Sequence, residues 1–166
     1  MKMIFKIKNH NLDLYNTLLN LSRNIFFYRE MGLKDSFETR IYLMFLHFSI
    51  ILIIFKKNKI KYPQSSYDNL FFSIENNLRE LGFGDVAVNK KMKDINKIFY
   101  DILLKLNIDE RSIKINKKLI LKYFSHLEDD CSKKYELFDQ YLLKFYHFCF
   151  ELSAENMIKD AIKFKV

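Results

Sequence analysis

Residues 41–55 form an almost entirely apolar segment, IYLMFLHFSIILIIF, which limits the folds open to this chain. A helix of this length spans about 22 Å at roughly 1.5 Å per residue, whereas the hydrocarbon core of a bilayer is about 30 Å thick. Arg40 and Lys56 bound the segment, and His47 lies near its middle. We predict a buried central helix with His47 hydrogen-bonded inside the core, and keep a membrane-spanning or dipping segment as the alternative.

The rest of the chain also has helical periodicity. Apolar residues recur three and four positions apart, and no alternating strand pattern competes with them. Three glycines and one proline exclude turn-rich β-sandwiches, collagen-like chains and Gly/Pro-rich disordered chains. Hydrophobic residues make up 49% of the chain, which is enough apolar surface to exclude intrinsic disorder. The sequence therefore predicts one all-α domain over residues 1–166, a bundle of six to seven helices.

Cap and stop residues predict where these helices begin and end. Gly32 and Gly82 are expected to stop helices, Asp35 with Glu38 resembles a capping box, and Pro63 suits a first helical turn. Ser132 and Ser153 are expected to cap the last two helices. The predicted helices span residues 12–29, 35–55, 63–81, 85–106, 119–127 and 132–152, followed by a short helix after residue 153. Residues 107–116 are predicted to be a polar connection.

The chain is basic, with 28 Lys and Arg against 20 Asp and Glu and a formal net charge of +8. A basic surface predicts affinity for an anionic partner such as RNA or acidic lipid. Lys90, Lys93 and Lys97 share a helix face with Asp94 and Asp101, so a solvated face of ion pairs and a docking surface are equally consistent with this pattern. No acidic residue accompanies the lysines that we predict to dock on an anionic surface: Lys56, Lys57, Lys59 and Lys61.

No catalytic, cofactor or metal site is predicted. Cys149 lies on the apolar stripe of its helix, which predicts an inert buried thiol. Asp35 and Asp85 are more simply helix caps than an acid–base pair. The spacing of His126, Asp129, Asp130 and Cys131 matches no zinc pattern.

Some helices carry more apolar residues than one buried face needs. Leu143 and Phe150 lie off the main stripe of residues 132–152, and Phe72 lies off the stripe of residues 63–81. A helix that is apolar nearly all round is either enclosed or exposes a patch for a partner. We predict an apolar binding surface at these three residues.

Several motifs occur together in the first two thirds of the chain. Four motifs follow one another: RNIFFY at residues 23–28, GLKD at 32–35, LRELGFGD at 78–85 and KKMK at 90–93. Three residue pairs lie between and after them: Tyr67-Asp68, Phe71-Phe72 and Phe99-Tyr100. Over residues 12–150 the chain resembles the ubiquinol–cytochrome c chaperone family, whose central signature reads LREMGVGD…VGKRVK. The motif residues that this resemblance selects are Arg23, Tyr28, Asp35, Arg40, His47, Asp68, Arg79, Glu80, Gly82, Gly84, Asp85, Lys90, Lys91 and Lys93.

The chain departs from the family pattern at a few positions. Asn89 stands where the family usually has glycine, Lys91 replaces an arginine, and Asp101-Ile102 replaces a Gly-Arg pair. Contacts that depend on a flexible backbone or a guanidinium group at these positions are not expected here. Within the motif, Arg79, Glu80 and Asp85 are expected to hold the turn between two helices.

The resemblance implies a chaperone or assembly factor without catalytic activity. Its relatives assist cytochrome b of the ubiquinol–cytochrome c reductase, so the implied partners are a cytochrome b client, the ribosome or inner-membrane surface, and a small partner subunit. Without a recognisable presequence the chain is similar to a bacterial member, cytoplasmic and peripheral at the inner membrane, with the mitochondrial matrix as the alternative. No transmembrane segment of its own is expected.

Two other functional classes remain open from the residues. One is a basic helical module that binds nucleic acid or the ribosome without a client. The other is an enzyme or small-ligand protein that uses buried helix faces as a pocket. A closed cavity with convergent polar groups would favour the second, and an open apolar groove would favour the chaperone.

Overall fold

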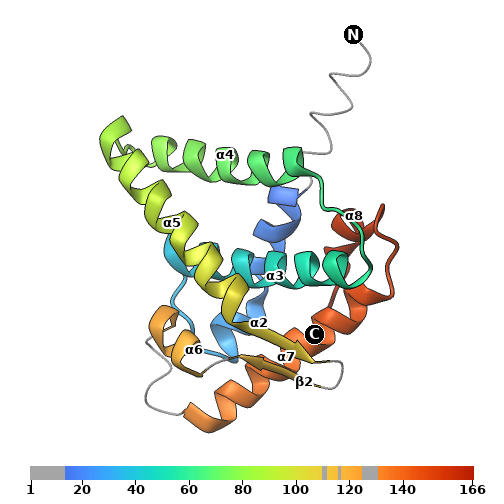
Figure 1. The fold of residues 1–166 in the computed structure, drawn as a ribbon. Helices are drawn as coiled ribbons and strands as arrows, with labels where there is room; N and C mark the ends of the chain where they lie inside the picture. The colour runs from blue at the N-terminus through green and yellow to red at the C-terminus, as the bar shows by residue number, and fades with distance from the viewer. Residues whose placement is uncertain (1–13, 110–111, 116, 125–130) are drawn as a thin grey trace.

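The computed structural model describes residues 14–109, 112–115, 117–124 and 131–166. Residues 14–22 are helical, and seven further helices and a two-stranded sheet follow (Figure 1). These elements are α2 (Ile25–Arg29), α3 (Phe37–Lys57), α4 (Gln64–Glu80), α5 (Asp85–Lys105), β1 (Leu106–Asp109), β2 (Ser112–Ile115), α6 (Lys117–Tyr123), α7 (Cys131–Phe150) and α8 (Met157–Ala161). The predicted all-α class is confirmed, with one small hairpin added to it.

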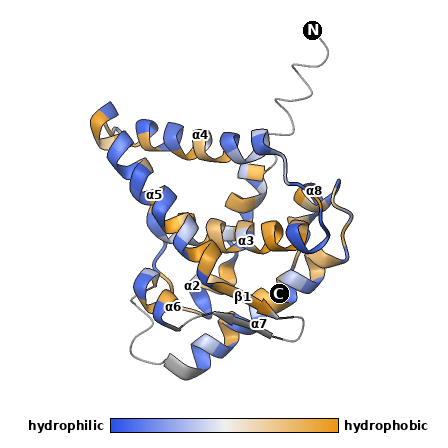
Figure 2. Cartoon of the chain, in the orientation of Figure 1, coloured by the Kyte–Doolittle hydropathy of each residue, from blue (hydrophilic) through white to orange (hydrophobic). Residues whose placement is uncertain are grey.

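Helix α3 lies at the centre and packs against α5 and α7 (Figure 1). Among the described residues it is the one helix long and apolar enough to cross a membrane, but 67% of its most apolar window is buried inside the protein. This burial identifies α3 as the predicted core helix. Figure 2 shows many hydrophobic residues along α3, whereas α5 combines hydrophilic and hydrophobic residues.

The core around α3 is aromatic. His47 is fully buried; its Nδ1 lies 2.7 Å from the Leu43 carbonyl oxygen and its Nε2 lies 2.8 Å from the Tyr141 hydroxyl. The rings of Phe27 and Phe145 pack edge-on against the imidazole. Burial lowers the pKa of His47 to about 4, so the ring is neutral at pH 7, with Nδ1–H donating to Leu43 and Nε2 accepting from Tyr141. The predicted core histidine is confirmed.

The first predicted helix is broken in two. Asn24 has non-helical backbone angles (φ -55°, ψ 127°), and its side-chain oxygen accepts a hydrogen bond from the Phe26 N–H at 3.0 Å. Asparagine favours such caps over helix interiors, so α2 starts anew at Ile25. The apolar spacing continues across the break, which explains why periodicity did not detect it.

Three predicted caps differ from the structure. Ser36, not Asp35, caps α3, because its hydroxyl accepts from the Thr39 N–H at 3.2 Å while Asp35 is engaged by an arginine. Helix α7 already begins at Cys131, before Ser132, and Asn156 rather than Ser153 precedes α8.

The predicted polar connection over residues 107–116 instead contains an antiparallel hairpin. Leu106 pairs with Ile115 and Ile108 with Ile113. Apolar residues alternate with polar ones in both strands of this hairpin, the period of a strand, although each run is only four residues long. Strand β2 lies against α7.

Helices α4 and α5 form a hairpin that ends in the predicted glycine turn. Gly82 has φ +93°, its N–H donates to the Arg79 carbonyl at 2.9 Å, and the Phe83 N–H donates to the Leu78 carbonyl at 3.2 Å. Residues 79–87 are all exposed, and this turn is one extremity of the molecule (Figure 1). Along the predicted helix 85–106, the apolar residues spaced three and four positions apart form a stripe, of which Val88, Ile95, Phe99, Ile102 and Leu106 are buried and Met92 is half-buried.

Candidate functional site

Three adjoining hollows form one groove along the N-terminal half of α3. The first, of about 370 Å³, lies between residues 14–22, α3 and α4, and the third, of about 480 Å³, lies between α3, α5 and α6. A hollow of about 140 Å³ joins them, since it shares Phe37 and Ile41 with the first and Tyr42 and Ile98 with the third. We call this the α3 groove; its main lining residues are Leu19, Arg23, Phe37, Arg40, Ile41, Tyr42, Leu78, Glu80, Lys91, Asp94, Ile98, Asp101, Lys122 and Tyr123.

The floor of the α3 groove is apolar because α3 turns one side of its surplus apolar surface towards it. Phe37, Ile41 and Tyr42 come from the first turns of α3, and Ile98 comes from α5. Phe37, Tyr42 and Ile98 are half-buried, so they contact the core and still face the groove. Such a floor can hold apolar side chains of another chain.

Paired charges form the first end of the groove. The Arg40 guanidinium grips Asp35 with two hydrogen bonds, from Nε to Oδ1 at 2.7 Å and from Nη2 to Oδ2 at 2.9 Å. The hydrogen bonds from Arg40 hold the pKa of Asp35 below its usual value, and nearby Arg23 lowers it further. Burial raises the pKa of Tyr28, whose hydroxyl donates to the Ser22 carbonyl at 2.6 Å. Arg40 thus has an ion-pair partner within the protein.

A cluster around Asp101 closes the other end. Its carboxylate accepts hydrogen bonds from Lys105 at 2.5 Å, from Lys122 at 2.8 Å and from the Tyr123 hydroxyl at 2.5 Å. These bonds hold the pKa of Asp101 well below its usual range, and burial together with Asp101 raises the pKa of Tyr123 to about 12. The cluster ties α6 to α5.

The sequence did not predict this cluster. Spacing along the helix pairs Asp101 with Lys97, which lies on the same helix face. Lys122 lies 21 residues further along the chain and reaches Asp101 only in the folded molecule.

Residues 29–109 match the sequence model of the family described as ubiquinol-cytochrome C chaperone. This match agrees with the family resemblance that the motifs indicate. The matched range contains α3, α4 and α5, which supply most of the α3 groove. The crystal structure of the Cbp3 homolog from Brucella abortus has the same fold, with a TM-score of 0.65 at 21% identity over 95% of this chain and 91% of that chain. A search of curated proteins found no match.

The fold distributes the family motif over several places. Arg23, Arg40, Glu80 and Lys91 line the groove, and Tyr28 and Asp35 adjoin it through Arg40. His47 lies in the core. Asp68 accepts from the Gln64 side chain on the exposed face of α4, at 2.9 Å.

The remaining motif residues lie at the α4–α5 turn. Arg79 pairs with Glu75 at 2.6 Å and with Asp85 at 3.5 Å, so it connects the end of α4 to the start of α5 as expected. Gly84 has open space around its Cα. Lys91 Nζ lies 4.6 Å from the centre of the Phe83 ring, while Lys90 and Lys93 are exposed on the following turn.

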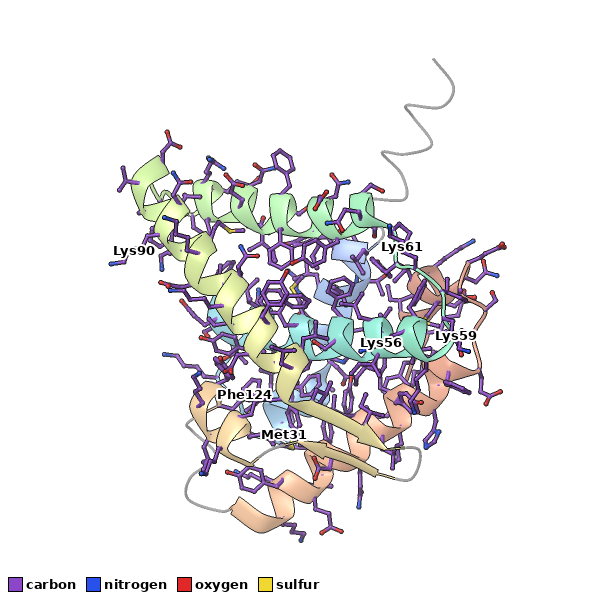
Figure 3. All side chains as sticks on the ribbon, in the orientation of Figure 1. Met31, Lys56, Lys59, Lys61, Lys90 and Phe124 are labelled. Atoms are coloured by element: carbon purple, nitrogen blue, oxygen red, sulfur yellow. The ribbon has the colours of Figure 1, made fainter. Side chains whose placement is uncertain are left out.

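The predicted docking lysines surround the end of α3. Lys56 and Lys57 are in its last turn, and Lys59 and Lys61 follow in the connection to α4. Figure 3 shows Lys56, Lys59 and Lys61 at the opposite side of the molecule from Lys90. The lysines of α5 and the lysines around the C-terminal end of α3 therefore belong to two separate surfaces.

The residues predicted to hold a client lie outside the groove. Phe72 on α4 and Phe150 on α7 are exposed, by 59% and 42%, and Leu143 is half-buried against the core. Their role in binding remains a prediction. The groove itself was missed because its floor and rim come from distant segments; the clustering of family residues in 23–40 and 78–85 was the signal closest to it.

The described residues contain no cluster of three or more His, Cys, Asp and Glu side chains that could hold a metal ion. His126, Asp129 and Asp130 lie outside the described residues. Burial raises the pKa of the Cys149 thiol to about 12, so the thiolate is scarce at pH 7, as predicted for an inert core cysteine.

Proposed function

We propose that this protein is a non-catalytic chaperone for cytochrome b of the ubiquinol–cytochrome c reductase, and that it holds an apolar segment of this client in the α3 groove. The observation that carries the proposal is an open groove with an apolar floor and a charged rim in a member of this chaperone family. Apolar burial provides about 25 cal/mol per Å² without requiring a particular side chain, which suits a client that is released again.

The polar groups of the groove support a binding role. A catalytic site needs groups that converge on a reacting atom, whereas Arg40 is engaged by Asp35 and Asp101 by two lysines and a tyrosine. These charged groups already have partners within the protein. These groups hold the walls of the groove in place.

The proposal includes the site of action. The chain works in the cytoplasm at the inner membrane, with the mitochondrial matrix as the alternative, and the lysines after α3 dock on an anionic surface of the ribosome or membrane. A small partner subunit completes the assembly complex in this view.

A photo-crosslinking experiment tests the client site. A photoreactive phenylalanine replaces Phe37 or Ile98 in the groove, Phe72 on the predicted apolar surface, or Leu104, an exposed residue elsewhere on α5. We expect crosslinks to newly made cytochrome b from positions 37 and 98 and none from 104. Crosslinks from 72 alone would move the client to α4, and equal labelling from all positions would refute a specific site.

Deletion of the gene in its host tests the role as a whole. Assembled cytochrome b should fall while its transcript stays unchanged. Unchanged cytochrome b would contradict the proposed function.

The second candidate is a helical module that binds ribosomal RNA without a client, favoured by the net charge of +8. Electrostatic binding to RNA weakens steeply as salt rises, whereas client binding through apolar contact does not. A salt series on the purified complexes distinguishes the two candidates.

A further inference from the structure

The connection between α3 and α4 combines positive charge with exposed apolar surface. Lys56, Lys57, Lys59 and Lys61 are all exposed, and Ile60 stands among them with 42% of its surface exposed. No Asp or Glu occurs from residue 39 to residue 67. The local charge is therefore not neutralised by acidic neighbours in the sequence.

This connection is held in one shape. Asn58 and Ile60 donate backbone hydrogen bonds back to Ile54 and Phe55, at 3.0 and 2.9 Å, and Lys59 adopts φ +56° to complete the turn. Tyr62 anchors the following residues, because its ring packs on Phe55 at 5.0 Å between ring centres. The turn thus presents Ile60 outward instead of folding it into the core.

Helix α7 extends the same surface. Lys57 Nζ donates to the Tyr146 hydroxyl at 3.1 Å, and the Tyr146 ring packs against Phe150 with 5.7 Å between ring centres. Phe150 is itself 42% exposed. We call this surface the lysine–apolar patch: Lys56, Lys57, Lys59, Ile60, Lys61 and Phe150. Figure 3 shows three of its lysines around the end of α3, beside the C-terminal helices.

We propose that the lysine–apolar patch binds the surface of an anionic lipid bilayer, with Ile60 and Phe150 entering the interface and the lysines contacting phosphates. Each lysine near such a surface strengthens binding roughly fivefold, and an apolar side chain supplies the second signal that stable attachment requires. RNA offers phosphates to the lysines but no apolar environment to an isoleucine. The aliphatic Ile60 therefore favours lipid over RNA.

This inference rests on the docking part of the proposed function and names its partner. It also orients the molecule, since the patch lies at the C-terminal end of α3 and the α3 groove begins at its N-terminal end. A helix of 21 residues is about 30 Å long, so the groove extends away from the bilayer into the aqueous phase.

The absence of tryptophan from the chain permits a direct test. Ile60→Trp places a single tryptophan in the patch of the full-length protein, and Leu104→Trp places one at an exposed control site. With vesicles containing phosphatidylglycerol we expect a blue shift of the emission for Ile60→Trp only. Vesicles of phosphatidylcholine alone, and a structured RNA, should produce no shift at either position.

Matched variants test the energetic contributions by vesicle sedimentation. Two double variants should each weaken binding to anionic vesicles at least tenfold. One combines Ile60→Ser with Phe150→Ser, and the other combines Lys59→Gln with Lys61→Gln. Lys90→Gln with Lys93→Gln removes the same charge from the other surface and should change binding less than threefold. Circular dichroism checks that each variant folds; these side chains are exposed, so folding should be retained.

Equal weakening by the two lysine pairs would overturn the proposal, because it would indicate attraction by net charge. Binding that needs the lysines but not Ile60 and Phe150, together with tight RNA binding, would overturn it in favour of RNA. If the protein without patch substitutions does not bind anionic vesicles but position 98 still crosslinks to cytochrome b, this inference alone is rejected. If vesicles are bound but no crosslinks form, the client site is rejected.

Discussion

His47 shows at the scale of one residue how this core combines polar and apolar packing. Both ring nitrogens have partners, the Leu43 carbonyl and the Tyr141 hydroxyl, and the charged form has no solvent to stabilise it. Burial therefore keeps the pKa of His47 at about 4, below the value of 6.5 expected in the unfolded chain.

We predict that the free energy of unfolding decreases as the pH falls from 6.5 to about 4. In this range the unfolded state takes up a proton on His47 that the folded state excludes, and above 6.5 neither state does. The loss approaches 1.4 kcal/mol per pH unit, about 3 kcal/mol in all. Urea denaturation at pH 7.5 and 4.5 measures it. His47→Phe should remove most of this slope; an unchanged slope in that variant would contradict the assignment.

At the scale of elements, two connections between helices show how a few residues hold neighbouring elements together. The α4–α5 turn needs the left-handed conformation of Gly82, which costs a residue with a side chain about 1–2 kcal/mol. The α5–α6 contact depends on the hydrogen bonds of Asp101.

The two glycines of the turn should respond differently to the same substitution. Gly82→Ser should lower the free energy of unfolding by about 1–2 kcal/mol because φ is +93° there. Gly84→Ser should leave it unchanged or raise it slightly, since Gly84 caps α5 with open space around it and serine is a favoured cap. Denaturation curves of both variants measure the difference; equal losses would argue against the turn geometry.

Asp101→Asn should loosen α6 without unfolding the protein. Asparagine keeps the size of the side chain but loses the charge that binds Lys105 and Lys122, at a cost of about 1–2 kcal/mol for charge-assisted bonds at a partly exposed site. Amide exchange should accelerate in α6 and remain slow in α3. Asp94→Asn, which loses only a 3.9 Å contact with Lys97, is the control.

At the scale of the whole molecule, the groove and the lysine–apolar patch occupy different ends of α3. This separation allows the proposed client holding and the proposed surface docking to be tested independently. The middle of α3, which lies between them, is buried in the core.

Ile98→Asp should reduce cytochrome b crosslinking from position 37 at least tenfold, while vesicle binding stays intact. The carboxylate would place an unpaired charge on the apolar floor of the groove. Leu104→Asp adds the same charge on the exposed face of α5 and should leave both activities unchanged. Equal loss of crosslinking in the two variants would indicate a general charge effect and not a groove.

Local pattern was sufficient for the helical class, the core position of α3, the buried stripe of α5 and the glycine turn at residue 82. Apolar spacing and backbone preference act within a few residues, so they can be recognised without the fold. The same reasoning failed where two local preferences compete, as at Asn24, or where each strand is only four residues long, as in the hairpin.

The amino-acid sequence indicated the family resemblance and the surplus of apolar helix surface, because motifs and periodicity are local features of the chain. Folding determined where that surplus is exposed: the groove takes Leu19, Ile41, Leu78 and Ile98 from four helices, and Asp101 meets Lys122 across two of them. Such contacts join residues far apart in the chain, and their positions follow from the packing of whole helices rather than from any local preference.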